Sequence, residues 1–113
     1  PDGKKNLLLA ISASWCGPCI KSLPKMRKAY DEISDNIIFV STWKDPNLKT
    51  FTDNHRNKKQ VISWPNLWDP YGLMPSAIRI KTFPSYILFD PSGKEINRWE
   101  GKFPNNLESI ILN

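Results

Sequence analysis

The sequence predicts an α/β fold built on a mixed β-sheet flanked by helices. A short apolar segment, a segment with helical periodicity and a second apolar segment follow one another within residues 1–43. Near the C-terminus, two strand-like segments are separated by a turn sequence. Strands joined through a helix pair in parallel, whereas strands joined by a tight turn pair antiparallel. The order therefore predicts a parallel βαβ unit followed by an antiparallel hairpin.

The length of 113 residues is that of a single domain, and 40% hydrophobic residues can fill one modest core. We expect one domain spanning residues 1–113. The start at Pro1 and the basic Gly3-Lys4-Lys5 sequence are compatible with a domain excised from a longer membrane-anchored or secreted chain, whose signal peptide would lie upstream.

The charge and hydropathy patterns argue against two classes of protein. The net charge of +5 is spread along the chain, and its densest basic stretch is only Arg56, Lys58 and Lys59. A nucleic-acid-binding protein would show a basic stripe interleaved with aromatics, so a solvated helix face is expected instead. The longest apolar run, Leu7–Ile11, is far shorter than a membrane span and fits a buried strand.

The first half of the chain reads as strand, helix, strand. Residues 7–12 are apolar enough for a strand buried on both faces, and residues 36–43 form a second strand. Between them, an amphipathic helix begins at the cysteines, with Pro24 inside it as the expected cause of a kink. Its apolar stripe consists of Ile20, Leu23, Met26, Tyr30 and Ile33.

The second half begins with a polar segment, residues 47–60, in which Leu48, Phe51 and His55 recur at helical spacing. Residues 61–76 show no clear period and are interpreted as irregular, ending in a short helical turn over residues 71–78.

The hairpin comes next. Tyr86–Asp90 and Glu95–Trp99 read as its strands around the turn Pro91–Lys94. A final helix is expected to open at Pro104, because proline is favourable in a first helical turn. Leu107, Ile110 and Ile111 would form its buried stripe.

The chemistry-bearing motif is Trp15-Cys16-Gly17-Pro18-Cys19, between the first strand and the first helix. Unpaired amides and the helix dipole at a helix N-terminus favour a thiolate, so Cys16 is expected to have a pKa below the roughly 8.5 of a free thiol. Cys19, one turn later, could resolve a mixed disulfide formed at Cys16. Gly17 and Pro18 constrain the turn and tune the balance between dithiol and disulfide.

Two other interpretations of the cysteines stay open. They could form a permanent disulfide or remain two inert thiols. They could also bind zinc, but a structural site needs four ligands, and His55 is the only histidine, with acids left to complete the set. We therefore expect no metal and no organic cofactor.

These residues resemble the active-site motif of the thioredoxin-like superfamily. Pro24, five residues after Cys19, matches the kinking proline of the family's active-site helix, and Phe83-Pro84-Ser85 resembles its cis-proline loop. The resemblance implies that Phe83 and Pro84 contact the substrate, with the backbone of Phe83 pairing with an extended substrate peptide as a short added strand. An ordinary trans proline at a strand entry is the alternative. Trp15 would flank the thiol and help docking, or pack locally.

The segment between Trp43 and Thr82 is longer than in classical thioredoxins. It resembles the extra helical segment of bacterial extracytoplasmic thiol-disulfide oxidoreductases of the cytochrome-maturation type. The resemblance implies a periplasmic or cell-envelope location, with the cytoplasm as the alternative. Ala10 stands where thioredoxins have a buried Asp that assists proton transfer; Asp45 could replace it or could cap a helix.

Four further tryptophans are expected mainly in the core. They are Trp43, Trp64, Trp68 and Trp99. Among these, the stretch Trp64-Pro65-Asn66-Leu67-Trp68 is the best candidate for lining a substrate groove, because it lies in the segment that departs from the family pattern.

Together these features predict a thiol-disulfide oxidoreductase, acting as a reductase on protein dithiols or disulfides through Cys16 and Cys19. It would need an upstream redox partner, bind no nucleic acid, contain no membrane span and be a monomer. The alternative is a thioredoxin-like peptide-binding or chaperone domain with little redox turnover.

Overall fold

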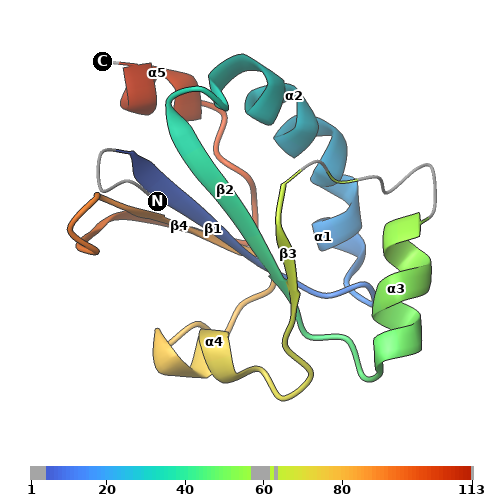
Figure 1. Cartoon of the computed structure of the whole chain (residues 1–113). Helices are drawn as coiled ribbons and strands as arrows, with labels where there is room; N and C mark the ends of the chain where they lie inside the picture. The colour runs from blue at the N-terminus through green and yellow to red at the C-terminus, as the bar shows by residue number, and fades with distance from the viewer. Residues whose placement is uncertain (1–4, 57–61, 63, 113) are drawn as a thin grey trace.

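The computed structural model describes residues 5–56, 62 and 64–112, which form a five-stranded sheet with helices packed on it (Figure 1). The strands are β1 (Asn6–Ser12), β2 (Ile37–Trp43), β3 (Asn66–Trp68), β4 (Ser85–Phe89) and β5 (Glu95–Glu100). The helices are α1 (Gly17–Lys21), α2 (Leu23–Ile33), α3 (Leu48–Arg56), α4 (Leu73–Ala77) and α5 (Leu107–Leu112).

The sheet is mixed, with the strand order β3-β2-β1-β4-β5. β1 pairs in parallel with β2, and β2 in parallel with β3. β4 runs antiparallel to both β1 and β5. The predicted α/β fold, with a parallel βαβ unit and a C-terminal antiparallel hairpin, is therefore confirmed.

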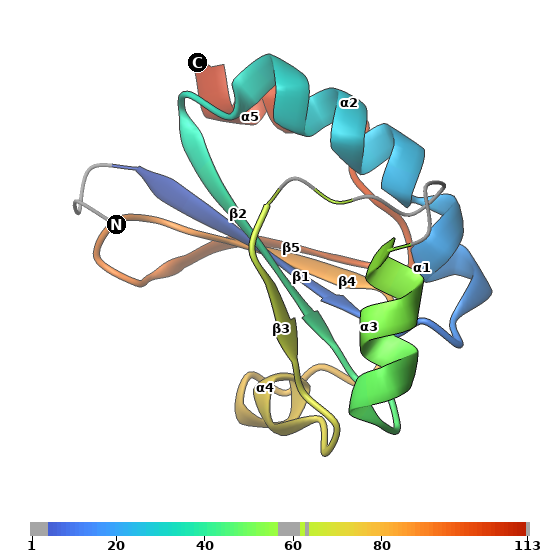
Figure 2. The ribbon, with the colours of Figure 1, turned by 45° about the vertical axis from the view of Figure 1, so that its right-hand side comes forward.

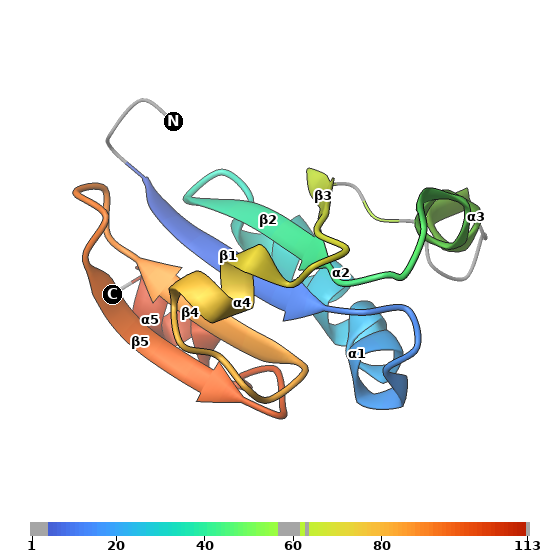
Figure 3. The same cartoon turned by 90° about the horizontal axis from the view of Figure 1, so that it is seen from below.

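Helices lie on both faces of the sheet. α1, α2 and α5 lie on one face and α4 on the other (Figures 2 and 3). Side chains alternate along β1, so that Leu8 and Ala10 enter the hydrophobic cluster under α2, whereas Leu9 and Ile11 enter the cluster beside α4. β1 is thus buried on both faces, as its apolar sequence predicts.

The helix that follows the cysteines is divided in two at Ser22, where a single kinked helix was predicted. Proline has no amide hydrogen, so Pro24 cannot donate to the carbonyl of Ile20. The amide of Ser22 instead donates to Pro18 and Ile20, and Pro24 lies in the first turn of α2. The proline therefore begins a new helix.

The middle segment contains a strand that the sequence pattern did not predict. Residues 61–76 were expected to be irregular, but β3 pairs with the end of β2, bringing Trp68 beside Trp43. Its three residues are too few to show a period, and the pairing depends on the partner strand. α3 and α4 agree with the helical segments expected here, although the predicted end of α3 at Gln60 lies outside the described residues.

The prediction that Pro104 opens the last helix is wrong. α5 begins at Leu107, and Ser109 Oγ donates to the carbonyl of Asn106 just before it. Phe103 is instead buried edge-on against the Tyr86 ring at a centroid distance of 5.1 Å, and residues 103 and 104 belong to the irregular connection between β5 and α5. Leu107 is buried, and Ile110 and Ile111 are partly buried against the same cluster, as expected.

Candidate functional site

Cys16 and Cys19 are joined by a disulfide at the start of α1, with their Cα atoms 5.2 Å apart. Cys16 is the N-cap of α1 and has an extended backbone (φ −94°, ψ 109°). Its sulfur accepts a hydrogen bond of 3.3 Å from the amide of Cys19. Cys16 is 6% exposed and Cys19 1% exposed, so Cys16 is the more accessible of the two sulfur-bearing residues.

The predicted tuning residues, Gly17 and Pro18, complete the first turn of α1 and are exposed. A Cβ on Gly17 would meet no atom within 4 Å. The disulfide packs with Ala13 and Phe83 in a small cluster of its own. Neither cysteine belongs to the two larger hydrophobic clusters of the sheet, but Phe83 also packs against the one beside α4 and so connects the redox pair to it.

The loop before Cys16 is held by Asp45, which lies in the loop after β2. The Asp45 carboxylate accepts one hydrogen bond from the amide of Ser14 (2.6 Å) and one from its hydroxyl (2.8 Å). Asp45 is fully buried. The alternative that Asp45 caps a helix is wrong, because Asn47 caps α3 through a 2.8 Å bond from the amide of Thr50.

Trp15 lies on the surface beside the disulfide. Its side chain is 62% exposed, and its indole N–H donates to the carbonyl of Lys44 (2.9 Å). The ring stacks on Phe83 at a centroid distance of 5.7 Å. The structure therefore brings together Trp15 and Phe83, two residues that the sequence nominated for substrate contact.

The Phe83–Pro84 peptide bond is cis. Pro84 is buried and immediately precedes β4, and its carbonyl accepts a 2.7 Å hydrogen bond from the amide of Gly101. Phe83 is half-buried and contacts the cysteine cluster. The proposed peptide-contacting loop is thus adjacent to the disulfide.

A hydrogen-bonded pair beneath the helix break supports the second cysteine. Ser22 Oγ donates to the carbonyl of Cys19 (2.8 Å) and lies 2.7 Å from the hydroxyl of Tyr86, with which it shares a hydrogen bond. Burial raises the pKa of Tyr86 to about 12, an effect that the Ser22 hydrogen bond opposes. The neutral phenol is therefore the form that the fold favours.

The remaining tryptophans mostly serve packing. Trp43 and Trp64 are buried and Trp99 is partly buried. Trp68 is 39% exposed, and its indole N–H donates to the carbonyl of Asp45 (3.0 Å). Of the stretch nominated for a groove, Trp68 is thus linked to the loop that holds Ser14, whereas Trp64 belongs to the core.

Three cations near Phe83 were not among the residues nominated from the sequence. They are Lys44, Arg79 and Lys81, which line a hollow together with Phe83. Arg79 and Lys81 lie just before Phe83-Pro84 in the chain, a proximity that could have drawn attention to them. Lys44 comes from another part of the sequence and is brought there by β2.

Two kinds of feature are absent from residues 5–56, 62 and 64–112. No group of three or more His, Cys, Asp or Glu side chains is arranged to hold a metal ion there. The side chain of His55 is not among those described. In the same residues, no helix is both long and apolar enough to cross a membrane.

The chain is similar to proteins of known families. A family model described as a thioredoxin-like domain matches residues 1–112. The thioredoxin-like protein YneN of Bacillus subtilis is 27% identical over 97 residues, a stretch that covers 79% of this chain and 52% of that protein. The chain spans about half or less of the length of the first curated relatives it matches.

Solved structures show the same fold. A protein of Chlorobium tepidum assigned as the thiol:disulfide interchange protein DsbE superposes with a TM-score of 0.86 and 25% identity, over 97% of this chain and 79% of that one. The exposed lipoprotein thioredoxin of Streptococcus pneumoniae superposes with a TM-score of 0.82 and 21% identity, over 96% and 84% of the two chains.

The Cys16–Cys19 pair at disulfide distance fits a Cys-x-x-Cys redox pair, and it lies at a helix start beside a cis-proline loop on a mixed five-stranded sheet. The family model covers nearly every residue that carries these features. The resemblance read from the sequence is thereby confirmed: the chain belongs to the thioredoxin-like domain family.

Proposed function

We propose that this domain is a thiol-disulfide oxidoreductase that reduces disulfides in protein substrates through Cys16 and Cys19. The observation that carries the proposal is the position of the disulfide at the start of α1, beside the exposed Trp15 and the half-buried Phe83. A purely structural disulfide does not require such an exposed aromatic neighbour.

The reaction follows from thiol–disulfide exchange. The reduced domain attacks one sulfur of the substrate disulfide with the Cys16 thiolate, forming a mixed disulfide and releasing the first substrate thiolate. Cys19, as its thiolate, then attacks Cys16 Sγ, which forms the Cys16–Cys19 disulfide and releases the second substrate thiolate. Two electrons pass to the substrate, and a dithiol on an upstream partner must return them.

Burial and hydrogen bonding support this division of roles. Cys16 is the more accessible of the two, and the amide of Cys19 already points at its sulfur. When the disulfide opens, that amide can donate to a Cys16 thiolate, which stabilises the attacking form. Cys19 is nearly inaccessible, so it can be reached only by the neighbouring sulfur.

Phe83, Pro84 and Trp15 are proposed to hold the substrate peptide, and Gly17 and Pro18 to tune the redox balance. All strands of the described residues belong to one sheet, which supports a single domain. We further propose that the domain acts as a monomer outside the cytoplasm. The shared fold of the exposed pneumococcal lipoprotein supports that location.

The test is the redox equilibrium of the purified domain in a glutathione series, read by tryptophan fluorescence and thiol trapping. A reversible two-electron transition near the roughly −270 mV of thioredoxin is expected for a reductase. A transition near about −120 mV, where the strong oxidants lie, would make the domain a disulfide donor instead. If the pair never exchanges, the peptide-binding alternative replaces the proposal.

A matched pair of variants assigns the roles of the cysteines. Cys19→Ser should accumulate a mixed disulfide with a substrate peptide, because nothing resolves it. Cys16→Ser should accumulate none, since Cys19 is buried. Equal trapping by both variants would contradict the assignment, and mass spectrometry of the trapped species distinguishes these outcomes.

A further inference from the structure

A hollow of about 820 Å³ lies between α4, the loop after β2 and the segment that leads into β4. The residues that define it here are Lys44, Tyr71, Arg79, Lys81 and Phe83, and we refer to it as the basic hollow. Phe83 also contacts the cysteine cluster and stacks on Trp15. The basic hollow is therefore adjacent to the redox pair through a shared side chain.

The described lining of the basic hollow carries a net positive charge. Its described lining includes Lys44, Arg79 and Lys81 but no carboxylate, and all three cations are exposed. Within the part of the chain that the structure describes, the ion pair present is Arg98–Glu95 on β5, and none involves these three. Acidic groups on a partner would be electrostatically complementary to these three cations.

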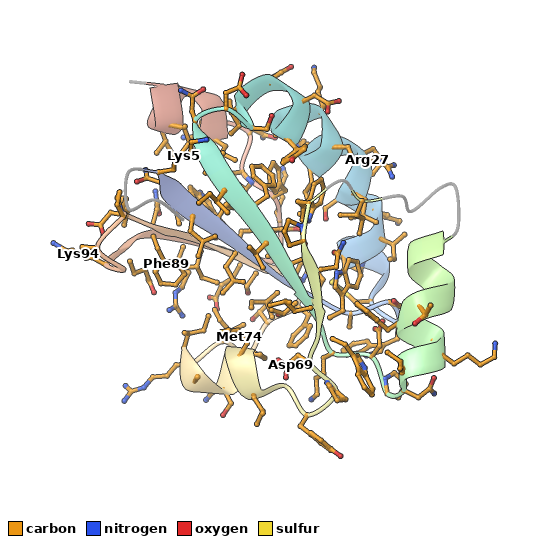
Figure 4. The ribbon with its side chains drawn as sticks, viewed as in Figure 1. Lys5, Arg27, Asp69, Met74, Phe89 and Lys94 are labelled. Carbon is orange, nitrogen blue, oxygen red and sulfur yellow. A yellow bond between two sulfur atoms is a disulfide. The ribbon has the colours of Figure 1, made fainter. Side chains whose placement is uncertain are left out.

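The two acids closest to the lining residues in the sequence are Asp45 and Asp69, and both accept hydrogen bonds from other groups. Asp69 lies between the end of β3 and α4 (Figure 4). Its two carboxylate oxygens accept hydrogen bonds from the amides of Leu73 (2.9 Å) and Met74 (3.0 Å), at the start of α4. Both carboxylate oxygens of Asp69 are thus hydrogen-bonded to the first amides of α4.

Arg79 has a backbone conformation that favours glycine. Its φ is 59°, and it follows α4 in a Schellman arrangement, in which the amide of Ile80 donates to Pro75 (2.7 Å) and the amide of Arg79 to Ser76 (3.3 Å). Glycine is the usual residue at this position because it has no Cβ to strain. Arginine here stabilises the fold less than glycine would. The presence of an arginine at this position is therefore better explained by a function of its guanidinium than by stability.

The side chain of Lys44 lies next to Gly72 in the lining of the same hollow. A Cβ on Gly72 would lie 3.1 Å from Cε and 3.5 Å from Nζ of Lys44, so the bare glycine leaves room for the lysine side chain. The carbonyl of Lys44 meanwhile holds the indole of Trp15. One residue thus links the charge of the basic hollow to the loop that carries Cys16.

We propose that the basic hollow binds an acidic segment of the protein substrate, next to the cysteine that reacts with Cys16. Glutamate or aspartate side chains of that segment pair with Lys44, Arg79 and Lys81, while Tyr71 and Phe83 give it an aromatic surface. The inference rests on the proposed function, because the peptide must also present a disulfide to the pair. Binding in the basic hollow would make the choice of substrate depend on the negative charge next to its disulfide.

The test uses two peptides that carry the same disulfide and differ only in four flanking residues, all Glu in one and all Gln in the other. Reduced wild-type domain should reduce the Glu peptide with a kcat/KM about tenfold higher, as three exposed ion pairs allow. The preference should largely disappear at about 0.5 M salt, where the Debye length is only a few ångströms.

Arg79→Gly is the most informative variant. It should lose about half or more of the preference for the Glu peptide while melting at a higher temperature, since it removes both the charge and the backbone strain. Arg79→Gln, which removes only the charge, should lose the same preference without gaining stability. Lys94→Gln is the matched control, because Lys94 lies in the hairpin turn at the far end of β4 and should leave the preference intact (Figure 4).

The outcomes separate this inference from the proposed function. If reduced wild type reduces neither peptide, the proposed function fails. If it reduces both peptides at the same rate, only the basic hollow inference is overturned. Binding to vesicles rich in phosphatidylglycerol that is lost in Arg79→Gln, with no peptide preference, would likewise overturn it in favour of a lipid surface.

Discussion

The buried carboxylate of Asp45 and the surface loop residue Ser14 are joined by two hydrogen bonds, although 31 positions separate them in the chain. The carboxylate satisfies both the amide and the hydroxyl of Ser14, two residues before Cys16. The carbonyl of Asp45 in turn accepts from Trp68, and that of Lys44 from Trp15. The loop after β2 is thus the support of the cysteine loop.

Asp45→Ala should therefore destabilise the oxidised domain by about 1–3 kcal/mol, because it leaves the amide of Ser14 without its buried acceptor. Asp45→Asn is the matched control: its amide oxygen can accept from the Ser14 amide and its NH₂ can donate to the hydroxyl, so it should lose less. Urea denaturation measures both. Equal losses would show that the charge, not the hydrogen bonds, matters. If Asp45 also assists proton transfer, both variants should show a pH profile of the resolving step that differs from that of wild type.

Trp15→Ala should weaken substrate docking more than folding. The side chain is mostly exposed, so its removal should cost the fold only the stacking on Phe83, which contributes about 0.5–1.5 kcal/mol to stability. We expect the KM for a disulfide peptide to rise roughly threefold to tenfold, if the peptide uses the same aromatic surface. Ile96→Ala, at an exposed position of β5, is the control and should leave KM unchanged. A KM for Trp15→Ala equal to that of Ile96→Ala would limit Trp15 to local packing.

Ser22→Ala should cost about 1–3 kcal/mol of stability, because it leaves the buried hydroxyl of Tyr86 without its partner. Removing that hydroxyl as well, in Ser22→Ala/Tyr86→Phe, should recover part of the loss. A double-mutant cycle from thermal or urea unfolding measures the coupling between the two side chains. Strictly additive effects would mean that the contact does not contribute to stability.

The stability of the domain should decrease in alkaline solution as Tyr86 titrates. Burial raises its folded pKa to about 12, while an unfolded tyrosine titrates near 10. Between these values the unfolded chain binds fewer protons, so stability falls as pH rises, by roughly 2–3 kcal/mol in total. Tyr86→Phe should lack this component. Identical pH dependence of the two proteins above pH ~10 would contradict the assignment.

The elements predicted from the sequence are those whose signal is local. β1, β2 and β4 have runs of apolar or β-branched residues, the turn sequence before β5 indicates the hairpin, and the first helix has a clear period. β3 escaped prediction because its three residues form a strand only through pairing with β2. Pro104 is compatible with a first helical turn and with an irregular connection. The structure has the irregular connection, in which Phe103 is buried.

The candidate site shows the same difference between residues with a local sequence signal and contacts between distant segments. Cys16, Cys19 and the Phe83-Pro84 loop were nominated from short motifs that carry their own context. The hydrogen bond from Ser14 to Asp45 depends on the connection between β1 and β2. The presence of Lys44 and Arg79 in the lining of one hollow depends on the positions of β2 and α4. Such contacts between distant segments leave no periodic trace in a single sequence.

The disulfide joins residues only three positions apart. The loop entropy that a disulfide removes from an unfolded chain grows with the length of the loop, so this bond constrains the unfolded chain far less than a long-range bridge would. The large buried clusters contain neither cysteine. We therefore expect the sheet and its large clusters to persist whether the bond is open or closed, as repeated cycles of the proposed electron transfer require.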